Sequence, residues 1–509
     1  METRARKERL TNAVRTVDVL LPAPSDRTVR MAKPVRATDG GTFRSVLRLA
    51  TDAQLRQTDM SARSCILRTD RFRIKAVIRH AAWSHRMNPV LPLEHCVPDA
   101  EPHVMPDGRL YLYGSYDVCG DDFYCSQQYH AFSTDNLVDW VHHGRSFCLE
   151  DSHCNRWSRL YAPDCMYRDG KYYLTYCASG KQEGIAVADM PYGPFKSGFP
   201  VEGADGDAID PTILLDDDGR VYYYWGQFNL RGARLADDLR SIDKSTLETN
   251  LLNEKEHEFH EGPSIRKRGE WYYLVYCDTS RGKATCLSYA MSRSPLGPFE
   301  KRGVIIDNDH CDPETWNNHG GMTEFRGRWY ICYHRSSQCS KYSRRACMEP
   351  IAFNDDGTIN EVEMTTQGPG GPLDPTVRMD ATRFCLMHGN LHVGVHGKTE
   401  YNDRHREFVQ KIHAGDWMAY KYFDFPAGLS RFSVRAGSSA FGGTIELHLD
   451  SPDGPLIGTC DVTPTGGWQL WHTFTCDVAI DKPGVHALYV CFTGLGANRL
   501  MDVESFRFV

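Results

Sequence analysis

Five polar residues recur at nearly the same distance before a turn glycine, and their types suit acid–base chemistry. They are Asp99, Asp164, Asp210, Glu261 and His319, each between six and nine residues before such a glycine. Carboxylates that converge repel one another unless a substrate, a cation or a shared proton compensates. Glycoside hydrolysis uses such a group, because one carboxylic acid protonates the leaving oxygen while a second carboxylate acts as base or nucleophile. A third carboxylate nearby raises the pKa of the acid.

An internal repeat supplies the elements that would bring these residues together. Its turn glycines are Gly108, Gly170, Gly219, Gly269 and Gly327, spaced 62, 49, 50 and 58 residues apart. Each glycine joins a short apolar strand to an aromatic-rich one such as RLYLYGS or RWYICYH, which is typical of a hairpin. Units of this length predict an all-β fold with five four-stranded blades of a β-propeller. The innermost strand of each blade starts near the axis, so the five polar residues should converge there.

The repeat defines the expected domains. Residues 87–380 should form the propeller, and GPGGPLDP at 368–375 resembles a linker. Residues 385–509 alternate apolar and polar positions between Gly, Pro and Asp turns, which predicts an antiparallel β-sandwich. Residues 1–86 show no repeat, and we expect a disordered or poorly structured extension.

Composition narrows the function class. Residues 1–86 hold 19 Lys and Arg against 8 Asp and Glu, so the rest of the 509-residue chain is acidic, which argues against nucleic acid as the main partner. No stretch is apolar enough for a membrane span or a secretory signal. The 18 cysteines are scattered singly along the chain, and we expect them to be buried free thiols. Because free thiols persist in a reducing compartment, we expect a cytoplasmic protein.

Segments at successive blades resemble glycoside hydrolase family 43, whose members are five-bladed propellers. The resembling segments are PDAEPHV at 98–104, YAPD at 161–164, AIDPTILLDDDG at 208–219, HEGPSI at 260–265 and NNHGG at 317–321. The resemblance implies Asp99 as general base, Asp210 as the residue that raises the pKa of the acid, and Glu261 as general acid. It also implies an axial cation, usually calcium, beside His319, and no organic cofactor.

Other roles follow from the same resemblance. SRRACMEP at 343–350 indicates that Arg344 faces the sugar. Tyr161 is expected to stack on a sugar or to be core, and Asp164 either contacts substrate or holds adjacent blades together. The family commonly has Asp-Pro at the base, whereas this chain reads Asp-Ala-Glu-Pro, so Glu101 is the alternative to Asp99.

Residues 430–509 resemble a family 6 carbohydrate-binding module. Trp468 stands where one of the module's two sugar-binding rings is expected, whereas Gln410 and Lys411 occupy the region of the second ring. Asp502 stands where the module's asparagine would be. A module that buttresses the propeller and one that binds sugar both fit this pattern.

Together these features predict an inverting exo-glycosidase, an α-L-arabinofuranosidase or β-xylosidase acting on plant-derived oligosaccharides. The sequence leaves the sugar and the oligomeric state open. A non-catalytic sugar-binding propeller is the alternative, but it would have no need to keep all three acids. A propeller scaffold for protein partners predicts no acid cluster, and a sialidase would show Ser-x-Asp-x-Gly-x-x-Trp turns, which this chain lacks.

Overall fold

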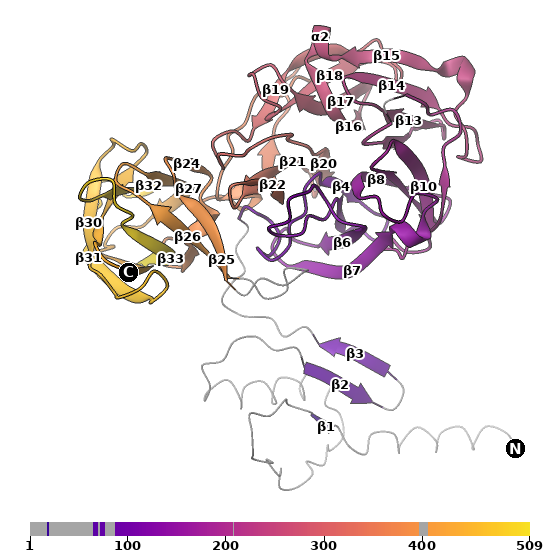
Figure 1. The fold of residues 1–509 in the computed structure, drawn as a ribbon. Helices are drawn as coiled ribbons and strands as arrows, with labels where there is room; N and C mark the ends of the chain where they lie inside the picture. The colour runs from indigo at the N-terminus through magenta and orange to yellow at the C-terminus, as the bar shows by residue number, and fades with distance from the viewer. Residues whose placement is uncertain (1–17, 20–64, 70–71, 77–86, 207, 397–405) are drawn as a thin grey trace, which may run out of the picture. The chain divides into compact units, whose positions relative to one another are not determined.

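The computed structural model describes residues 18–19, 65–69, 72–76, 87–206, 208–396 and 406–509. From residue 87 onward the fold is all-β: five consecutive small sheets form the blades of a propeller, followed by a β-sandwich (Figure 1). The prediction of fold class is therefore confirmed.

The strands of the blades follow the chain in order. The first blade consists of β4 (Glu101–Val104), β5 (Leu110–Gly114), β6 (Gln128–Thr134) and β7 (Trp140–Cys148). The second consists of β8 (Leu160–Arg168), β9 (Lys171–Ala178), β10 (Gln182–Ala188) and β11 (Lys196–Pro200). The third consists of β12 (Thr212–Leu215), β13 (Val221–Trp225), β14 (Asn229–Arg234) and β15 (Glu248–Asn253), after which comes a single helical turn, α2 (Glu254–His257). The fourth consists of β16 (Phe259–Arg268), β17 (Trp271–Asp278), β18 (Cys286–Ser292) and β19 (Glu300–Asp307). The fifth consists of β20 (Met322–Phe325), β21 (Arg328–Ser337) and β22 (Ser340–Ile351).

Glycines at the hairpin between the first two strands set the register of each blade. Gly108 and Gly219 have φ values of 77° and 80°, a left-handed conformation that costs glycine nothing and other residues energy. The second strands are rich in tyrosine and are buried on both faces, as the VYYYW of β13 shows. The aromatic rings therefore fill the space between neighbouring blades, while the hairpin fixes which residue of the first strand starts at the axis.

The fifth blade differs from the prediction of five four-stranded sheets, because it has three strands. The segment just before the first blade runs beside β22, the outer strand of the fifth blade. Val90 donates its backbone N–H to the carbonyl of Ala346, and the buried amide of Asn88 donates to the carbonyl of Met348 and accepts from its N–H. The start of the propeller thus covers the edge of its last strand, and an isolated bridge between Ala100 and Gly320 links the first and fifth blades.

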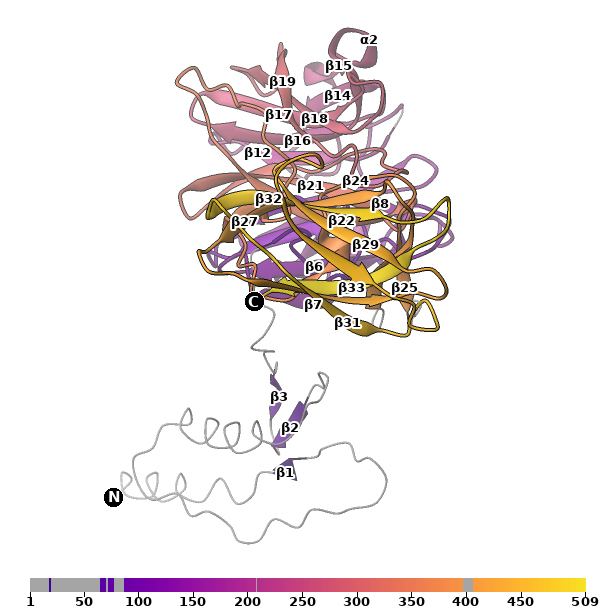
Figure 2. The same cartoon turned by 90° about the vertical axis from the view of Figure 1, so that its left-hand side faces the viewer.

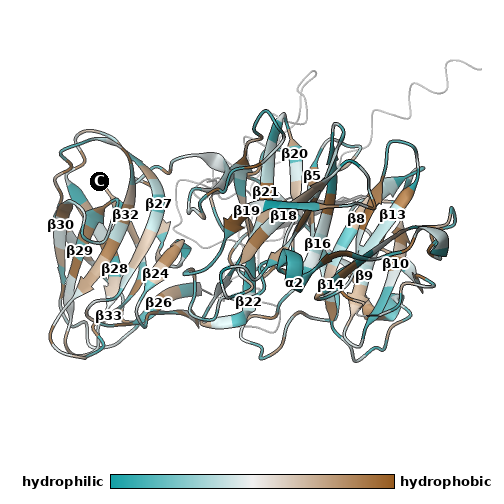
Figure 3. Cartoon of the chain, turned by 90° about the horizontal axis from the view of Figure 1, so that it is seen from above, coloured by the Kyte–Doolittle hydropathy of each residue, from teal (hydrophilic) through white to brown (hydrophobic). Residues whose placement is uncertain are grey.

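The second part is a sandwich of two antiparallel sheets (Figure 2). One sheet has the order β25 (His392–His396), β26 (Arg406–Ile412), β33 (Met501–Phe508), β28 (Arg431–Gly437) and β31 (His472–Asp477), with β23 (Met379–Asp380) also paired to β33. The other has the order β24 (Leu386–His388), β27 (Trp417–Phe425), β32 (Gly484–Thr493), β29 (Gly443–Leu449) and β30 (Leu456–Val462). Hydrophobic residues lie along the strands of both parts (Figure 3), and those facing inward between the two sheets form one core.

Buried polar contacts join the sandwich to the propeller. The guanidinium of Arg345, in β22, forms an ion pair with the carboxylate of Glu407, in β26, and both side chains are almost fully buried. Gln338 donates to the same carboxylate, and Leu373 pairs with Phe423 in a short parallel bridge. A buried, hydrogen-bonded ion pair is costly to break on one side only, so this contact holds the two parts in register.

Residues 1–84 form a separate unit, of which three strands are described. β1 (Asp18–Val19), β2 (Cys65–Thr69) and β3 (Phe72–Ala76) form a small antiparallel sheet. The rest of the predicted poorly structured extension lies outside the described residues. Among the described residues no helix is long and apolar enough to cross a membrane.

Glu183, in β10, provides a test of the propeller core. Its side chain is 6% exposed, one oxygen accepts a hydrogen bond from Tyr223, and burial raises its pKa from 4.5 to about 8. The unfolded chain therefore releases this proton between pH 4.5 and about 8 while the folded chain retains it, so stability falls as pH rises through that window. Glu183→Gln removes this loss. Between pH 4.5 and about 8, the free energy of unfolding of the variant minus that of wild type should increase by up to about 1.4 kcal/mol per pH unit. Urea denaturation at several pH values measures this difference.

The comparison at pH 5 serves as the internal control, because both proteins should then differ least. A constant difference between the two proteins from pH 5 to pH 8 would show that Glu183 is ionised in the fold.

Candidate active site

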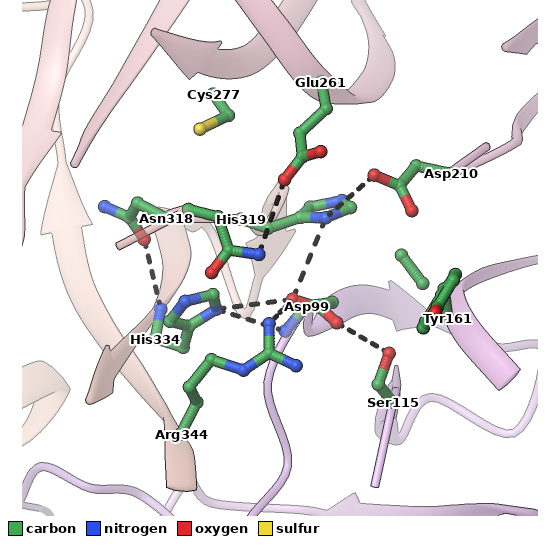
Figure 4. Close-up of polar contacts among 12 residues, drawn as sticks. Asp99, Ser115, Tyr161, Asp210, Glu261, Cys277, Asn318, His319, His334 and Arg344 are labelled. Carbon is green, nitrogen blue, oxygen red and sulfur yellow. Dashed lines mark hydrogen bonds and ion pairs between the residues drawn. The ribbon is translucent and has the colours of Figure 1, made fainter. Parts of the chain in front are cut away.

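Four of the five predicted polar residues meet at the propeller axis. Asp99, Asp210 and His319 lie two or three residues before the first strands of their blades, β4, β12 and β20. Glu261 lies within β16, the first strand of the fourth blade. His319 Nδ1 is 3.9 Å from Asp99 Oδ1 and 3.9 Å from Asp210 Oδ2. The carboxylates of Asp99, Asp210 and Glu261 point toward a common space around this ring (Figure 4). These three acids are 4%, 6% and 8% exposed, so the site is recessed but in contact with solvent.

The backbone conformation at two of the acids is unusual. Asp99 and Asp210 both have φ of 55°, in the left-handed region where non-glycine residues are uncommon. Aspartate tolerates this region better than most residues, and strain of this kind is often held at functional sites. The same conformation at equivalent points of the first and third blades turns both carboxylates toward the axis.

Arg344 holds the carboxylate of Asp99 in its ionised form. Its Nη1 donates to Asp99 Oδ1 at 3.0 Å, while its other nitrogens and its backbone N–H bind Asp117, also at 3.0 Å. Ser115 donates to the second oxygen of Asp99 at 2.6 Å. Burial alone would raise the pKa of Asp99, but the charge of Arg344 and the contact with His334 lower it well below its usual range. Arg344 is 1% exposed and faces the predicted base, and its expected contact with the sugar stays a prediction.

Asp210 and Glu261 form the other side of the site. Burial, followed by the negative charges of Glu261 and Asp99, raises the pKa of Asp210 well above its ordinary value. Asp210 therefore holds a proton more readily than Asp99 does. Gln227 donates to Glu261 Oε2 at 2.8 Å, and the Asn317 amide lies 3.4 Å from Oε1. The site therefore combines an ionised carboxylate, Asp99, with two further carboxyl groups in a different environment.

The site includes a second ring of residues that the sequence reasoning missed. These residues lie seven or eight positions after the hairpin glycines, at or just after the second strand of each blade: Ser115, Cys177, Gln227, Cys277 and His334. Ser115, Cys277 and His334 are seen at the site in Figure 4, while Cys177 contacts Asp210 and Gln227 contacts Glu261. Counting forward from each glycine, as well as backward, would have found them. Asp117 follows the same strand as Ser115 and was missed because its partner, Arg344, lies 227 residues away.

Glu101 and Asp164 belong to a different cluster, in which protein groups surround them. Glu101 Oε2 accepts from Arg266 at 2.7 Å and from Ser264 at 3.0 Å. Asp164 accepts from the Thr212 hydroxyl and from the backbone N–H of Ile213, and its other oxygen lies 2.5 Å from His103 Nε2.

This geometry corrects the prediction that Asp164 contacts substrate, because its carboxylate links three blades, which is the other role considered for it. It also favours Asp99 over Glu101 as the base, since the carboxylate of Glu101 is paired with Arg266 and bonded to Ser264, whereas that of Asp99 lies 3.9 Å from His319.

Comparison with known proteins agrees with this arrangement. The profile described as glycosyl hydrolases family 43 matches residues 87–359, and that of the carbohydrate binding module (family 6) matches residues 390–509. A xylosidase/arabinosidase of Thermoclostridium stercorarium is 30% identical over 478 residues, which cover 82% of this chain and 98% of that protein. The chain belongs to glycosyl hydrolase family 43. It is a glycosidase with a family 6 module at its C-terminal end.

Two further relatives are similar over most of the chain. An arabinoxylan arabinofuranohydrolase of Paenibacillus polymyxa is 27% identical and covers 80% of this chain and 72% of its own length. The crystal structure of a family 43 arabinoxylan arabinofuranohydrolase from Bacillus subtilis with cellotetraose is 26% identical, with a TM-score of 0.48, and covers 84% of this chain and 98% of that one.

The two aromatic residues predicted to bind sugar have different surroundings in this family 43 enzyme. Tyr161 is half-buried and lies on the Asp210 side of the axial site (Figure 4). Trp468 lies in the family 6 module, where Arg499 packs over its ring at 3.9 Å from ring centre to Cζ. Arg499 also binds Asp502, which accepts from Gln469 as well. The ring and the acid expected to hold a sugar in the module are therefore already engaged by protein.

Replacing Arg344 by lysine tests how the ionised state of Asp99 is maintained. Lysine keeps the charge but loses the forked hydrogen bonds, so the pKa of Asp99 should rise toward its ordinary value. Because a base works only when ionised, the acid limb of kcat/KM should move to higher pH, by about one unit. The pH profile of hydrolysis measures this shift.

Arg345→Lys is the matched control, since Arg345 faces Glu407 and not Asp99. If Arg344→Lys lowers the rate equally at all pH values, the arginine does not control the ionisation of Asp99.

Proposed function

We propose that this glycosidase removes terminal α-L-arabinofuranosyl or β-D-xylosyl residues from plant-derived oligosaccharides, with inversion of the anomeric centre. The observation that carries the proposal is the convergence of three acids at the axis. The carboxylates of Asp99, which Arg344 binds, and of Asp210 both lie 3.9 Å from His319 Nδ1, and the carboxylate of Glu261 points into the same space (Figure 4). The similarity to a xylosidase/arabinosidase and to an arabinoxylan arabinofuranohydrolase supports these sugars.

Asp99 acts as the general base in this mechanism. Both of its oxygens already accept hydrogen bonds, from Arg344 and Ser115, so the carboxylate is fixed in orientation. In an inverting enzyme it takes a proton from a water molecule as that water attacks the anomeric carbon. The charge of Arg344 keeps the base ready at neutral pH, at the cost of lower basicity.

Glu261 acts as the general acid. It donates a proton to the glycosidic oxygen as the bond to the anomeric carbon breaks, and the leaving sugar departs as an alcohol. Asp210, whose pKa is raised by burial and then by the charges of Glu261 and Asp99, lies beside it as the proposed modulator of the acid. Gln227, in the loop after β13, and Asn317, in the loop before β20, each contact one oxygen of Glu261.

We further propose that the axis holds a calcium ion, with donors supplied mainly by the cluster around Glu101. The ligand atoms of Glu101, His103 and Asp164 lie within 4.8 Å of one another, and Glu101 Oε1 is buried and accepts no hydrogen bond from the described part of the chain. Arg266 supplies one positive charge for two carboxylates. The pKa of Glu101 is raised to about 8, by burial first and by Asp164, against the lowering effect of Arg266.

These oxygen donors fit calcium, which prefers carboxylates. The ion would neutralise the remaining charge of the cluster, whereas His319, expected to sit beside it, lies nearer the catalytic acids.

We propose that the C-terminal module buttresses the propeller, because Arg499 covers Trp468 and Glu407 binds Arg345. We also propose a cytoplasmic location, in which buried thiols such as those of Cys96 and Cys332 remain reduced.

Glu261→Gln tests the function. Wild type should hydrolyse an arabinofuranosyl-substituted xylo-oligosaccharide or a linear β-D-xyloside such as xylobiose. The substitution should lower kcat by about 100-fold to 10,000-fold, because the sugar leaving group needs a proton from the acid. For the xyloside, NMR should show α-D-xylose as the first-formed anomer. Glu270→Gln, an exposed acid of the same blade, is the control and should change little. Equal rates for wild type and Glu261→Gln would remove Glu261 from the acid role, and a wild type that binds but never cleaves would favour a sugar-binding propeller.

Thermal unfolding tests the cation. Calcium added after EDTA treatment should raise the melting temperature of wild type by several degrees, because the ion stabilises the folded state only. In Glu101→Gln the shift should be much smaller. The same melting temperature for wild type with calcium and with EDTA would argue against an ion at the axis.

A further inference from the structure

Three partly exposed rings, those of Phe228, His260 and Trp316, each belong to a residue next in sequence to the predicted acid or to a side chain that contacts it, and His260 Nδ1 lies 3.1 Å from Glu254. Phe228 follows Gln227, which donates to Glu261; His260 precedes Glu261; and Trp316 precedes Asn317, whose amide lies near Glu261. Adjacent Cα atoms are about 3.8 Å apart, so each ring starts one residue from a group at the acid.

The three rings touch in a row. His260 lies edge-to-face with Phe228, at 5.2 Å between ring centres, and with Trp316, at 6.1 Å. The backbone N–H of Phe228 donates to the carbonyl of His260, which ties the loop after β13 to the start of β16. The row, which we name the aromatic shelf, is therefore a built surface and not three independent side chains.

The shelf is exposed where a core would not be. Phe228 is 45% exposed and Trp316 is 37% exposed, although most aromatic residues of the second strands are buried. Phe228 also has φ of 62°, a conformation that is rare for a bulky residue. A strained backbone that keeps an apolar ring in solvent indicates a binding role.

We infer that the aromatic shelf binds the sugar on the leaving-group side of the scissile bond, a xylopyranosyl ring of the oligosaccharide. This inference rests on the proposed function. The acid must touch the glycosidic oxygen, so the leaving sugar has to lie beside Glu261. Each ring of the shelf is one residue along the chain from Glu261, or from Gln227 or Asn317, which contact it. A xylopyranosyl ring has no hydroxymethyl group and offers C–H faces that pack on aromatic rings, while its hydroxyl groups stay in water. The shelf thus selects for an oligosaccharide over a small alcohol as leaving group.

The test varies the size of the leaving group. Wild type, Trp316→Ala and Phe228→Ala are compared on an arabinofuranosyl-substituted or linear xylo-oligosaccharide and on the corresponding methyl glycoside, whose methanol is too small to reach the shelf. In each variant, kcat/KM for the oligosaccharide should fall about tenfold, mostly because KM rises. The value of kcat/KM for the methyl glycoside should fall by less than about twofold. Inhibition by the free monosaccharide, which occupies only the other side of the bond, should be unchanged. Trp316→Phe should recover most of the loss.

Tyr167→Ala is the matched control, because Tyr167 is a 38% exposed aromatic residue at the other end of a first strand, in β8. Equal losses on both substrates in the shelf variants would show that the rings only support Glu261 and would overturn the inference. A wild type inactive on both substrates would instead count against the proposed function itself.

Discussion

The ion pairs of Arg344 are the interaction on which the active site depends. One guanidinium, 1% exposed, binds two carboxylates that are also buried, Asp99 and Asp117. Burying three charges is costly, and the cost is offset only because every nitrogen of the fork has a partner. Asp117 takes most of these bonds, which leaves one nitrogen for Asp99. The arginine is therefore held firmly by one acid so that it can set the charge of the other.

That arrangement separates the protonation states of acids that share a small space. Asp99 is kept ionised by Arg344, whereas Asp210, with no such partner, experiences the charges of Glu261 and Asp99 and gains a proton more easily. Environments that push the pKa values of neighbouring carboxyl groups apart assign the base and the proton-holding side. The neutral ring of His319, whose pKa is lowered by burial, lies between the two sides without adding a charge.

The hairpin repeat made much of this predictable from sequence. A glycine at a fixed place in each blade fixes where the first strand starts, so counting back from it was enough to bring Asp99, Asp210, Glu261 and His319 together. Counting residues could not show which side chains of different blades bind one another. The resemblance of SRRACMEP predicted Arg344 at the site, but its bonds to Asp117, which join the fifth blade to the first, could not be read from spacing. Asp164 has the right spacing, but its carboxylate belongs to the cluster around Glu101, where it contacts His103 and Thr212. In the sandwich, Trp468 has the right type and place, yet a nearby arginine covers it.

β22 explains how the sandwich is connected to the chemistry. Successive side chains of a strand point to opposite sides, so Arg344 and Arg345 cannot serve the same face. Arg344 reaches Asp99 at the axis, while Arg345 reaches Glu407 in the sandwich and the carbonyl of Leu93 in the segment that covers the last blade. Loss of the sandwich would leave Arg345 with an unmatched buried charge one residue from the group that controls the base. This contact is the physical basis of the proposed buttressing role: Arg499 packs over Trp468 in the module, while Glu407 pairs with the residue next to the one that binds Asp99.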